Sequence, residues 1–363
     1  MSRELHPEDI GDLCLGAAYF GAGGGGDVHF YRLIAERAIR RWGPVPLVRP
    51  EEIPEDALVV DVGESGSPIV GLEHLPPENH GVELLRRYER FLGRKVTHLI
   101  ACELGGANSV VPLVVAAACR LPVIDGDGMG RAFPESQMMT FPIYGVAPTP
   151  AACTDFLGNV VYFETSDAHE YERETRALVT VMGGSLLAMD HPMTAAQVRE
   201  TAVPGTLTLA QSVGRTLREH RGGADTLAPA LAAHLHGTAY GAVVPLYTGK
   251  VERVSRRTEG GFDVGEVMLR AFEGAAPPLR IALRNEFLVA WLGDTVVATT
   301  PDLITMVEQE SCQPITSERI RYGQRVSVIG IGAPRHYLTE RGLRVVSPRN
   351  MGFDLDYRPL AQE

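Results

Sequence analysis

The chain has 363 residues, of which 45% are hydrophobic and 22% charged, with a formal net charge of −11. A chain of this length exceeds the size of most single cores, so two domains are expected. The negative charge disfavours a nucleic-acid partner, because phosphate binding needs clustered Lys and Arg, and no apolar run is long enough to span a membrane. The five cysteines are dispersed and odd in number, which is typical of reduced thiols, and the N-terminus lacks an apolar leader. We therefore expect a cytoplasmic protein without a membrane partner.

The first half of the chain is predicted to alternate helices with short apolar strands. Pro7-Glu8-Asp9 is predicted to open a first helix that ends at Gly21, and after a glycine run Asp27 is suited to cap a second helix. The apolar runs that follow are separated by segments of helical periodicity, which is typical of buried, largely parallel strands. The predicted strands are 57–62, 68–71, 96–101 and 122–125, and the predicted helices between them are 81–92 and 109–119.

The second half changes character. A strand at 160–164 and helices at 170–182, after Thr194, after Thr206 and at 227–236 precede a series of short strands and turns between residues 242 and 331. The predicted fold is an α/β N-terminal domain with a largely parallel sheet plus a β-rich C-terminal domain, a barrel or sandwich of hairpins. The predicted boundaries are 1–165 for the α/β domain with the site, 166–240 for a helical connection, 241–335 for the β-rich domain and 336–363 for a C-terminal segment whose return to the first domain is left open.

The glycine run at 21–26 matches G-x-G-x-x-G, but a dinucleotide fingerprint follows a strand and this run follows a predicted helix. A P-loop is also excluded, because Asp27 and Val28 stand where Lys and Ser or Thr are needed. Two interpretations stay open. The run is either a sharp helix-to-helix turn or a loop whose amides bind a carboxylate or phosphate at a helix N-terminus. The predicted binding residues here are Gly23, Gly24, Gly25, Gly26 and Asp27.

Two loops follow the predicted parallel strands, at 102–108 and 125–135, and both are rich in glycine and carboxylates. Because the carboxyl ends of parallel strands meet at one sheet edge, we expect Glu103 and Asp125 to be neighbours. The second loop fails as a calcium loop, since Met129 and Ser136 occupy ligand positions. Its aspartates are either turn caps or groups that hold a cation or substrate N–H groups. The predicted catalytic residues are Glu103, Asp125 and Asp127, and the predicted substrate-binding residues here are Asn108, Arg131 and Glu135.

Cysteine and histidine offer weaker candidates. Cys102 ends a predicted strand, but no histidine partner is identifiable, so we expect it not to be a nucleophile. His29, His74 and His80 form no metal-binding motif, and each is expected to be a surface or structural residue.

Three blocks of the sequence together resemble one known family. They are LGAA at 15–18 with GAGGGGD at 21–27, ELGGANS at 103–109 and VIDGDGMGRAFPE at 123–135, with weaker likeness at 191–194, 204–206, 301–304 and 322–326. These blocks are similar to those of the S-methyl thiohydantoin desulfurase family. The resemblance covers nearly the whole chain and implies an α/β domain followed by a β-rich domain.

The resemblance also implies an activity and a partner. The activity is the hydrolytic removal of methanethiol from a small cyclic nitrogen-containing substrate, a hydantoin-like or S-methylated thiohydantoin ring, through carboxylate acid/base chemistry. The implied partner is a hydantoinase/oxoprolinase enzyme. The chain departs from the family at 64–68, where ESGSP replaces the usual Gly-Ala-Pro, which leaves the substrate open. No cofactor is fixed, although the carboxylates would suit a divalent metal, and a homo-oligomer is left open. The alternative to an enzyme is a non-catalytic binding or accessory subunit of a hydantoinase/oxoprolinase system.

Overall fold

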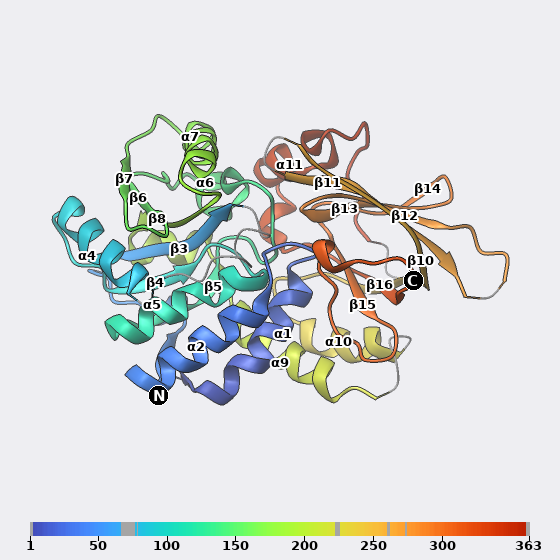
Figure 1. The fold of residues 1–363 in the computed structure, drawn as a ribbon, viewed down its shortest axis with the longest axis horizontal. Helices are drawn as coiled ribbons and strands as arrows, with labels where there is room; N and C mark the ends of the chain where they lie inside the picture. Colours follow the sequence, from blue (N-terminus) through green and yellow to red (C-terminus); the bar gives the residue numbers. More distant parts are fainter. Residues whose placement is uncertain are drawn as a thin grey trace.

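The computed structural model describes residues 3–66, 77, 79–221, 226–259, 262–272 and 274–360. Figure 1 shows helices packed around one sheet in the first part of the chain and a separate antiparallel sheet beside them. The expected fold class, an α/β domain joined to a β-rich domain, is confirmed. The predicted strand at 68–71 and His74 lie outside the described residues. Within the described residues, no helix combines the length and apolar character needed to cross a membrane.

Sheet A of the first domain has the strand order β1-β2-β5-β4-β3-β8-β6-β7, with β9 paired to β5. Its centre is parallel, as predicted: β2 pairs with β5, β5 with β4, and β4 with β3. Antiparallel strands flank this centre on both sides. The strands are β1 (Arg3–Leu5), β2 (Val45–Val48), β3 (Val59–Gly66), β4 (His98–Ala101), β5 (Val123–Asp127), β6 (Ala151–Thr154), β7 (Val160–Phe163), β8 (Ser185–Met193) and β9 (Val203–Pro204).

Both faces of sheet A are covered by helices. In the central strands, Val60 and Leu99 belong to one hydrophobic core, and Val59 and Ile100 belong to a second core on the other face. Because successive strand residues point to opposite faces, uninterrupted apolar strands need helices on both sides. The first core is shared by α1 (Ile10–Phe20), α2 (Val28–Trp42), α4 (His80–Leu92), α5 (Val111–Cys119), α9 (Thr206–Glu219) and α10 (Leu227–Leu235), and the second by α6 (Thr140–Ile143) and α8 (Ala195–Thr201).

Sheet B forms the second domain, with the antiparallel order β14-β13-β12-β11-β10-β16-β15. Its two ends approach each other, since β13 and β15 are in contact, so the sheet curls into a half-barrel instead of splitting into a sandwich. A third hydrophobic core fills its concave side. The strands are β10 (Val243–Glu259), β11 (Phe262–Ala271), β12 (Leu279–Arg284), β13 (Glu286–Leu292), β14 (Thr295–Thr299), β15 (Leu303–Glu308) and β16 (Arg325–Ile331).

The segment 166–240, interpreted from sequence as a helical connection, also supplies strands to sheet A. After α7 (Ala168–Val181), β8 inserts between β3 and β6. Its second half, Met189–Met193, contains Asp190 and His191. These polar residues interrupt the apolar pattern from which the strand could have been predicted. The connection is therefore part of the first domain's framework.

The last described segment touches both domains. Helix α11 (Glu340–Val346) packs on α6, and the Tyr337 hydroxyl donates to the carbonyl oxygen of Met138 at 2.9 Å. Farther along, the Tyr357 hydroxyl donates to Oδ1 of Asp302, which belongs to the second domain, at 2.9 Å. This end of the chain thus binds the two domains together.

The loop after β5 is a structural junction, and three of the residues predicted from sequence to act in the site have structural hydrogen-bond partners in it. Asp125 caps α9: its Oδ1 accepts from the Thr208 amide at 3.0 Å and its Oδ2 from the Thr208 hydroxyl at 2.5 Å. Asp127 closes a turn by accepting from the amides of Met129 and Gly130, each at 2.6 Å. Both aspartates are used as the caps that the sequence left open as an alternative.

Arg131, predicted to bind substrate, is fully buried at the same junction. Its guanidinium donates to the carbonyl oxygens of Pro301 and Asp302 at 3.0 and 2.9 Å and lies 4.3 Å from the centre of the Phe133 ring. Burial lowers its pKa to about 10. The guanidinium therefore ties the loop of the first domain to the turn between β14 and β15.

The cap on α9 generates a stability prediction. Replacing the carboxylate in Asp125→Ala is expected to lower the free energy of unfolding by about 0.5–2 kcal/mol, because two donors of Thr208 lose their acceptor. Chemical denaturation measures this change. In the double variant with Thr208→Ala, the loss should be smaller than the sum of the two single losses, since both substitutions remove the contact between the Thr208 hydroxyl and Oδ2 of Asp125. Additive losses would contradict the cap.

Candidate functional site

A cavity of about 160 Å³ lies where the carboxyl ends of β3 and β4 face the second domain. Open α/β sheets place ligands at this edge. The first domain contributes the glycine loop, the end of β3, the loop after β4 and the start of α7, and the second domain contributes residues of β11, β13 and the 3-10 helix at Ser317–Arg319. A cavity of about 150 Å³ holds a benzene-sized ring, so the size of this space fits a small cyclic molecule.

The glycine loop forms one wall because only residues without side chains allow the approach seen there. A Cβ on Gly24 would stand 2.0 Å from Oε1 of Glu286, and one on Gly25 would stand 2.3 Å from the carbonyl carbon of Gly105. The amide of Ala107 donates to the Gly25 carbonyl oxygen at 2.8 Å. The run is thus both a turn between helices and a close contact between three chain segments.

Four of the five residues predicted to form the glycine binding loop reach the cavity. Gly24, Gly25, Gly26 and Asp27 line the cavity, whereas Gly23 lies outside the lining, against the ring of Phe287. Asp27 caps α2, as predicted, by accepting from the His29 amide at 2.7 Å, and it also pairs with Arg319.

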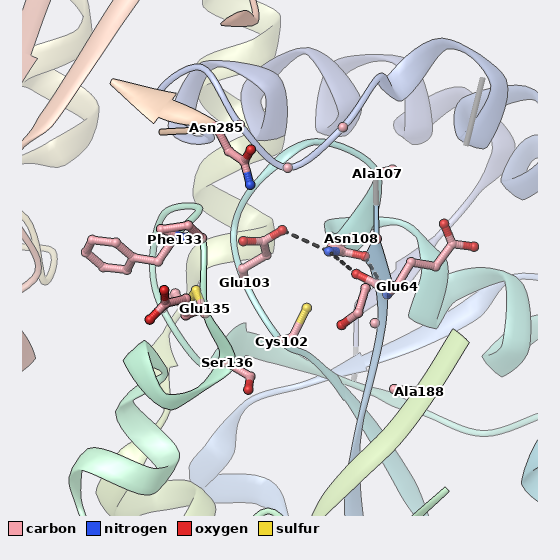
Figure 2. Close-up of a pocket in the computed structure, with 18 of the residues that line it drawn as sticks. Glu64, Cys102, Glu103, Ala107, Asn108, Phe133, Glu135, Ser136, Ala188 and Asn285 are labelled. Atoms are coloured by element: carbon pink, nitrogen blue, oxygen red, sulfur yellow. Dashed lines mark hydrogen bonds between the residues drawn. The ribbon is translucent and has the colours of Figure 1, made fainter. Parts of the chain in front are cut away.

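Asn108 organises the carboxylate wall of the cavity (Figure 2). Its Nδ2 donates to Oε1 of Glu103 at 2.9 Å and to the carbonyl oxygen of Glu64 at 3.1 Å, and its Oδ1 accepts from the Glu64 amide at 2.8 Å. The side-chain amide therefore fastens the loop after β4 to the end of β3. One consequence is that the carboxyl group of Glu103 is held in place at the cavity.

Three glutamates at the cavity have strongly raised pKa values. Burial raises the pKa of Glu103 to about 8, assisted by the charge of Asp127 and opposed by the Asn108 hydrogen bond. Burial, followed by the charge of Glu103, raises that of Glu286 to about 8. Burial also raises the pKa of Glu64 to about 7, against a hydrogen bond with Tyr31. Near neutral pH these carboxyls can therefore both donate and accept protons.

Glu135, predicted to bind substrate, lies on the cavity wall beneath a pair of arginines. Its Oε1 accepts from Arg284 at 2.6 Å. The guanidinium groups of Arg284 and Arg176 lie 3.9 and 4.4 Å from the ring centre of Phe262. Charge at this side of the cavity is thus balanced by arginine.

Some of the site residues predicted in the two loops reach the cavity and others do not. Glu103 and Asn108 line it, but Asp125, Asp127 and Arg131 do not. Parallel strands do bring Glu103 and Asp127 to the same edge, since Ala101 pairs with Asp127. The side chain of Asp127 turns toward its own loop amides, so it influences the cavity only through its charge.

The sequence interpretation missed a buried polar group at the cavity floor. Asp61 of β3, Asp190 of β8 and Tyr171 of α7 line the cavity there, and His191 of β8 lies behind them. A β-bulge explains how this group of residues forms and why the sequence pattern did not predict it. Asp61 pairs with Asp190 where regular pairing from Val59 and Met193 would place His191. His191 has φ +43°, so both consecutive residues of β8 reach Asp61, which simple alternation forbids. Its one sequence signal was the weak family likeness at 191–194.

Cys102 lies at the cavity, and His29 and His80 lie away from it. Cys102 lines the cavity beside Glu103 (Figure 2), and burial with nearby carboxylates raises its pKa, which disfavours the nucleophilic thiolate. His29 is exposed, and His80 is buried with Nε2 2.6 Å from the carbonyl oxygen of Asp155. Neither histidine lines the cavity.

Comparison with known proteins gives matches to two family models and a structural neighbour of similar fold. The family model described as S-Me-THD-like, N-terminal domain, matches residues 8–165, and the model described as S-Me-THD-like, C-terminal domain, matches residues 165–360. A crystal structure of a protein from Chromobacterium violaceum is similar with a TM-score of 0.82 at 24% identity, over 99% of this chain and 100% of that chain. At this identity the likeness supports a shared fold alone. No curated protein matches the chain. Since the two family models together cover residues 8–360, the chain belongs to the S-Me-THD-like family.

Proposed function

We propose that this chain is a hydrolase that removes methanethiol from a small S-methylated thiohydantoin ring. Water adds to the ring carbon that carries the sulfur, and the carbon–sulfur bond then breaks. The sulfur leaves with a proton as methanethiol, and the ring keeps a carbonyl oxygen and an N–H group. The observation that supports this chemistry most is the Glu103 carboxyl, which has a pKa of about 8 and is held by Asn108 in a cavity of ring size.

Glu103 and Glu64, the two residues that Asn108 contacts, each carry out one of the proton transfers. Glu103 keeps its proton at neutral pH and acts as the general acid toward the ring nitrogen or the departing sulfur. Glu64, with a pKa of about 7, is largely ionised slightly above neutral pH and acts as the general base toward the attacking water. Glu286 faces the same cavity from the second domain and offers a second protonated carboxyl to a ring carbonyl oxygen.

Removing the acid tests the assignment. Glu103→Gln is expected to lower kcat by about 10²–10⁴-fold, because the amide keeps the Asn108 contact on one side but cannot donate a proton in the transition state. Methanethiol release from S-methylated thiohydantoins, measured with a thiol reagent, reports the rate. Asp125→Ala is the matched control and should keep its turnover per folded molecule, since Asp125 lies away from the cavity. If the wild-type chain binds these rings without turnover, it is a binding or accessory subunit of a hydantoinase/oxoprolinase system and the hydrolase proposal is wrong.

The pH dependence should be bell-shaped. Because the base must be ionised, kcat/KM is expected to rise as the pH passes through about 7, the pKa of Glu64. Because the acid must be protonated, kcat/KM is expected to fall as the pH passes through about 8, the pKa of Glu103. A profile of initial rates from pH 5 to 10 measures both limbs. In Glu103→Gln the alkaline limb should disappear and the acid limb should stay, and the reverse result would exchange the two roles.

Cys102 tests the competing covalent route. We expect Cys102→Ala to retain most of its turnover, because the buried thiol has a raised pKa and little thiolate forms at neutral pH. Cys153→Ala, which removes a buried thiol from β6, controls for the packing loss. A folded Cys102→Ala variant without any turnover, alongside an active Cys153→Ala variant, would establish a nucleophilic cysteine.

A further inference from the structure

Asp61 and Asp190 line the cavity, and with the buried His191 behind them they form a compact set of nitrogen and oxygen ligands. Oδ1 of Asp190 lies 2.6 Å from Nδ1 of His191, and Oδ2 of Asp61 lies 3.9 Å from the same nitrogen. One ligand atom from each residue falls within 4.8 Å of the other two, and all three residues are buried. Ligands about 2.1 Å from a tetrahedral ion stand roughly 3.4 Å apart, so the observed separations bracket those of a metal centre.

Asp61 carries an independent sign of a missing partner. Its Oδ1 is buried and has no hydrogen-bond partner in the described part of the chain, and the side chain is 2% exposed and lines the cavity. An unsatisfied carboxylate oxygen of this kind is costly, and a second buried carboxylate beside it adds repulsion. The basic group in contact with the two carboxylates is His191, which is charged only when protonated. A cation between them would satisfy the free oxygen and balance the charge.

The surroundings orient these ligands as metal sites require. The Tyr171 hydroxyl donates to Oδ2 of Asp190 at 2.7 Å, which fixes the carboxylate and leaves Oδ1 turned toward His191. The His191 amide donates to the carbonyl oxygen of Pro148 at 3.0 Å, so the bulge of β8 is anchored outside the sheet. The geometry of the ligand set is therefore fixed by α7 and by the loop before β6.

We propose that Asp61, Asp190 and Nδ1 of His191 bind one divalent transition-metal ion, with Zn²⁺ as the preferred occupant. An imidazole nitrogen with two carboxylates suits Zn²⁺ and Co²⁺ better than Mg²⁺ or Ca²⁺, which take oxygen ligands. The ion would take the place of the contact between Nδ1 and Asp190, because a metal-bound imidazole nitrogen carries no proton. Three protein ligands leave a fourth position, and Asp61 and Asp190 both face the cavity, so that position is open to water or substrate.

This inference deepens the proposed hydrolase function and rests on it for the role of the ion. A Zn²⁺-bound water has a pKa of about 7, so the ion would supply hydroxide beside the cavity at neutral pH. Metal binding itself can be measured without substrate or turnover, which separates the two proposals.

The test is metal content and metal-linked stability of the full chain. After incubation with Zn²⁺ and gel filtration, mass spectrometry of the protein fraction should find one ion per chain, and the melting temperature should rise with Zn²⁺ and fall back with chelator. Titration with Co²⁺ should give the visible absorption of a four-coordinate ion and saturate at one equivalent. No retained Zn²⁺ and no saturable Co²⁺ spectrum would overturn the proposal.

Variants assign the ion to these ligands. Asp61→Asn, Asp190→Asn and His191→Asn are each expected to lose stoichiometric binding, and Asn suits the positive φ at position 191. Tyr171→Phe keeps all three ligands and should weaken binding about 10–100-fold, which guards against variants that fail to fold. Glu103→Gln and Asp125→Ala are the controls and should bind one ion. Undiminished binding in folded Asp61→Asn and Asp190→Asn would place the ion elsewhere and overturn the proposal.

Discussion

The cavity depends on the close contact between the glycine loop, the loop after β4 and the second domain. The carbonyl oxygens of Ala22, Gly23 and Gly25 accept from the amides of Phe287, Ser317 and Ala107, each at 2.8 Å. Backbone groups from both domains are thereby paired directly, without side chains between them. A Cβ at Gly25 would meet the backbone of Gly105, so the contact between the two loops of the first domain requires glycine, and a Cβ at Gly24 would displace the Glu286 carboxyl group.

The close contact between the domains keeps acidic groups out of water, and this burial raises their pKa values. Glu103 comes from the first domain and Glu286 from the second, and burial raises the pKa of each to about 8. Either glutamate in an exposed loop would be ionised at neutral pH and a poor proton donor. The interface between the domains therefore keeps both carboxyls protonated near neutral pH, which is the state that the proposed acid catalysis requires.

The cavity floor depends on a different constraint, the bulge in β8. Regular antiparallel pairing would put Asp190 and His191 on opposite faces of sheet A, and one of them would then lie away from Asp61. The extra residue and the positive φ of His191 bring both toward the same strand. A strained backbone next to buried polar ligands is typical of a functional site, and here it serves to gather three ligand atoms.

The sequence by itself determined the fold class, most of the strands and the acidic loops, because period-2 and helical patterns, glycine turns and capping residues act locally. It also placed Glu103 and Asn108 correctly, since parallel strands share an edge. Only the tertiary structure decided which carboxylates face the cavity. Asp125 and Asp127, like Glu103, are carboxylates in loops predicted to follow parallel strands. Their carboxylate groups, however, accept hydrogen bonds from nearby amides and a hydroxyl group. Asp61, Asp190 and Glu286 meet the site through strand pairing and domain contact, which join residues far apart in the chain and leave no local pattern to read.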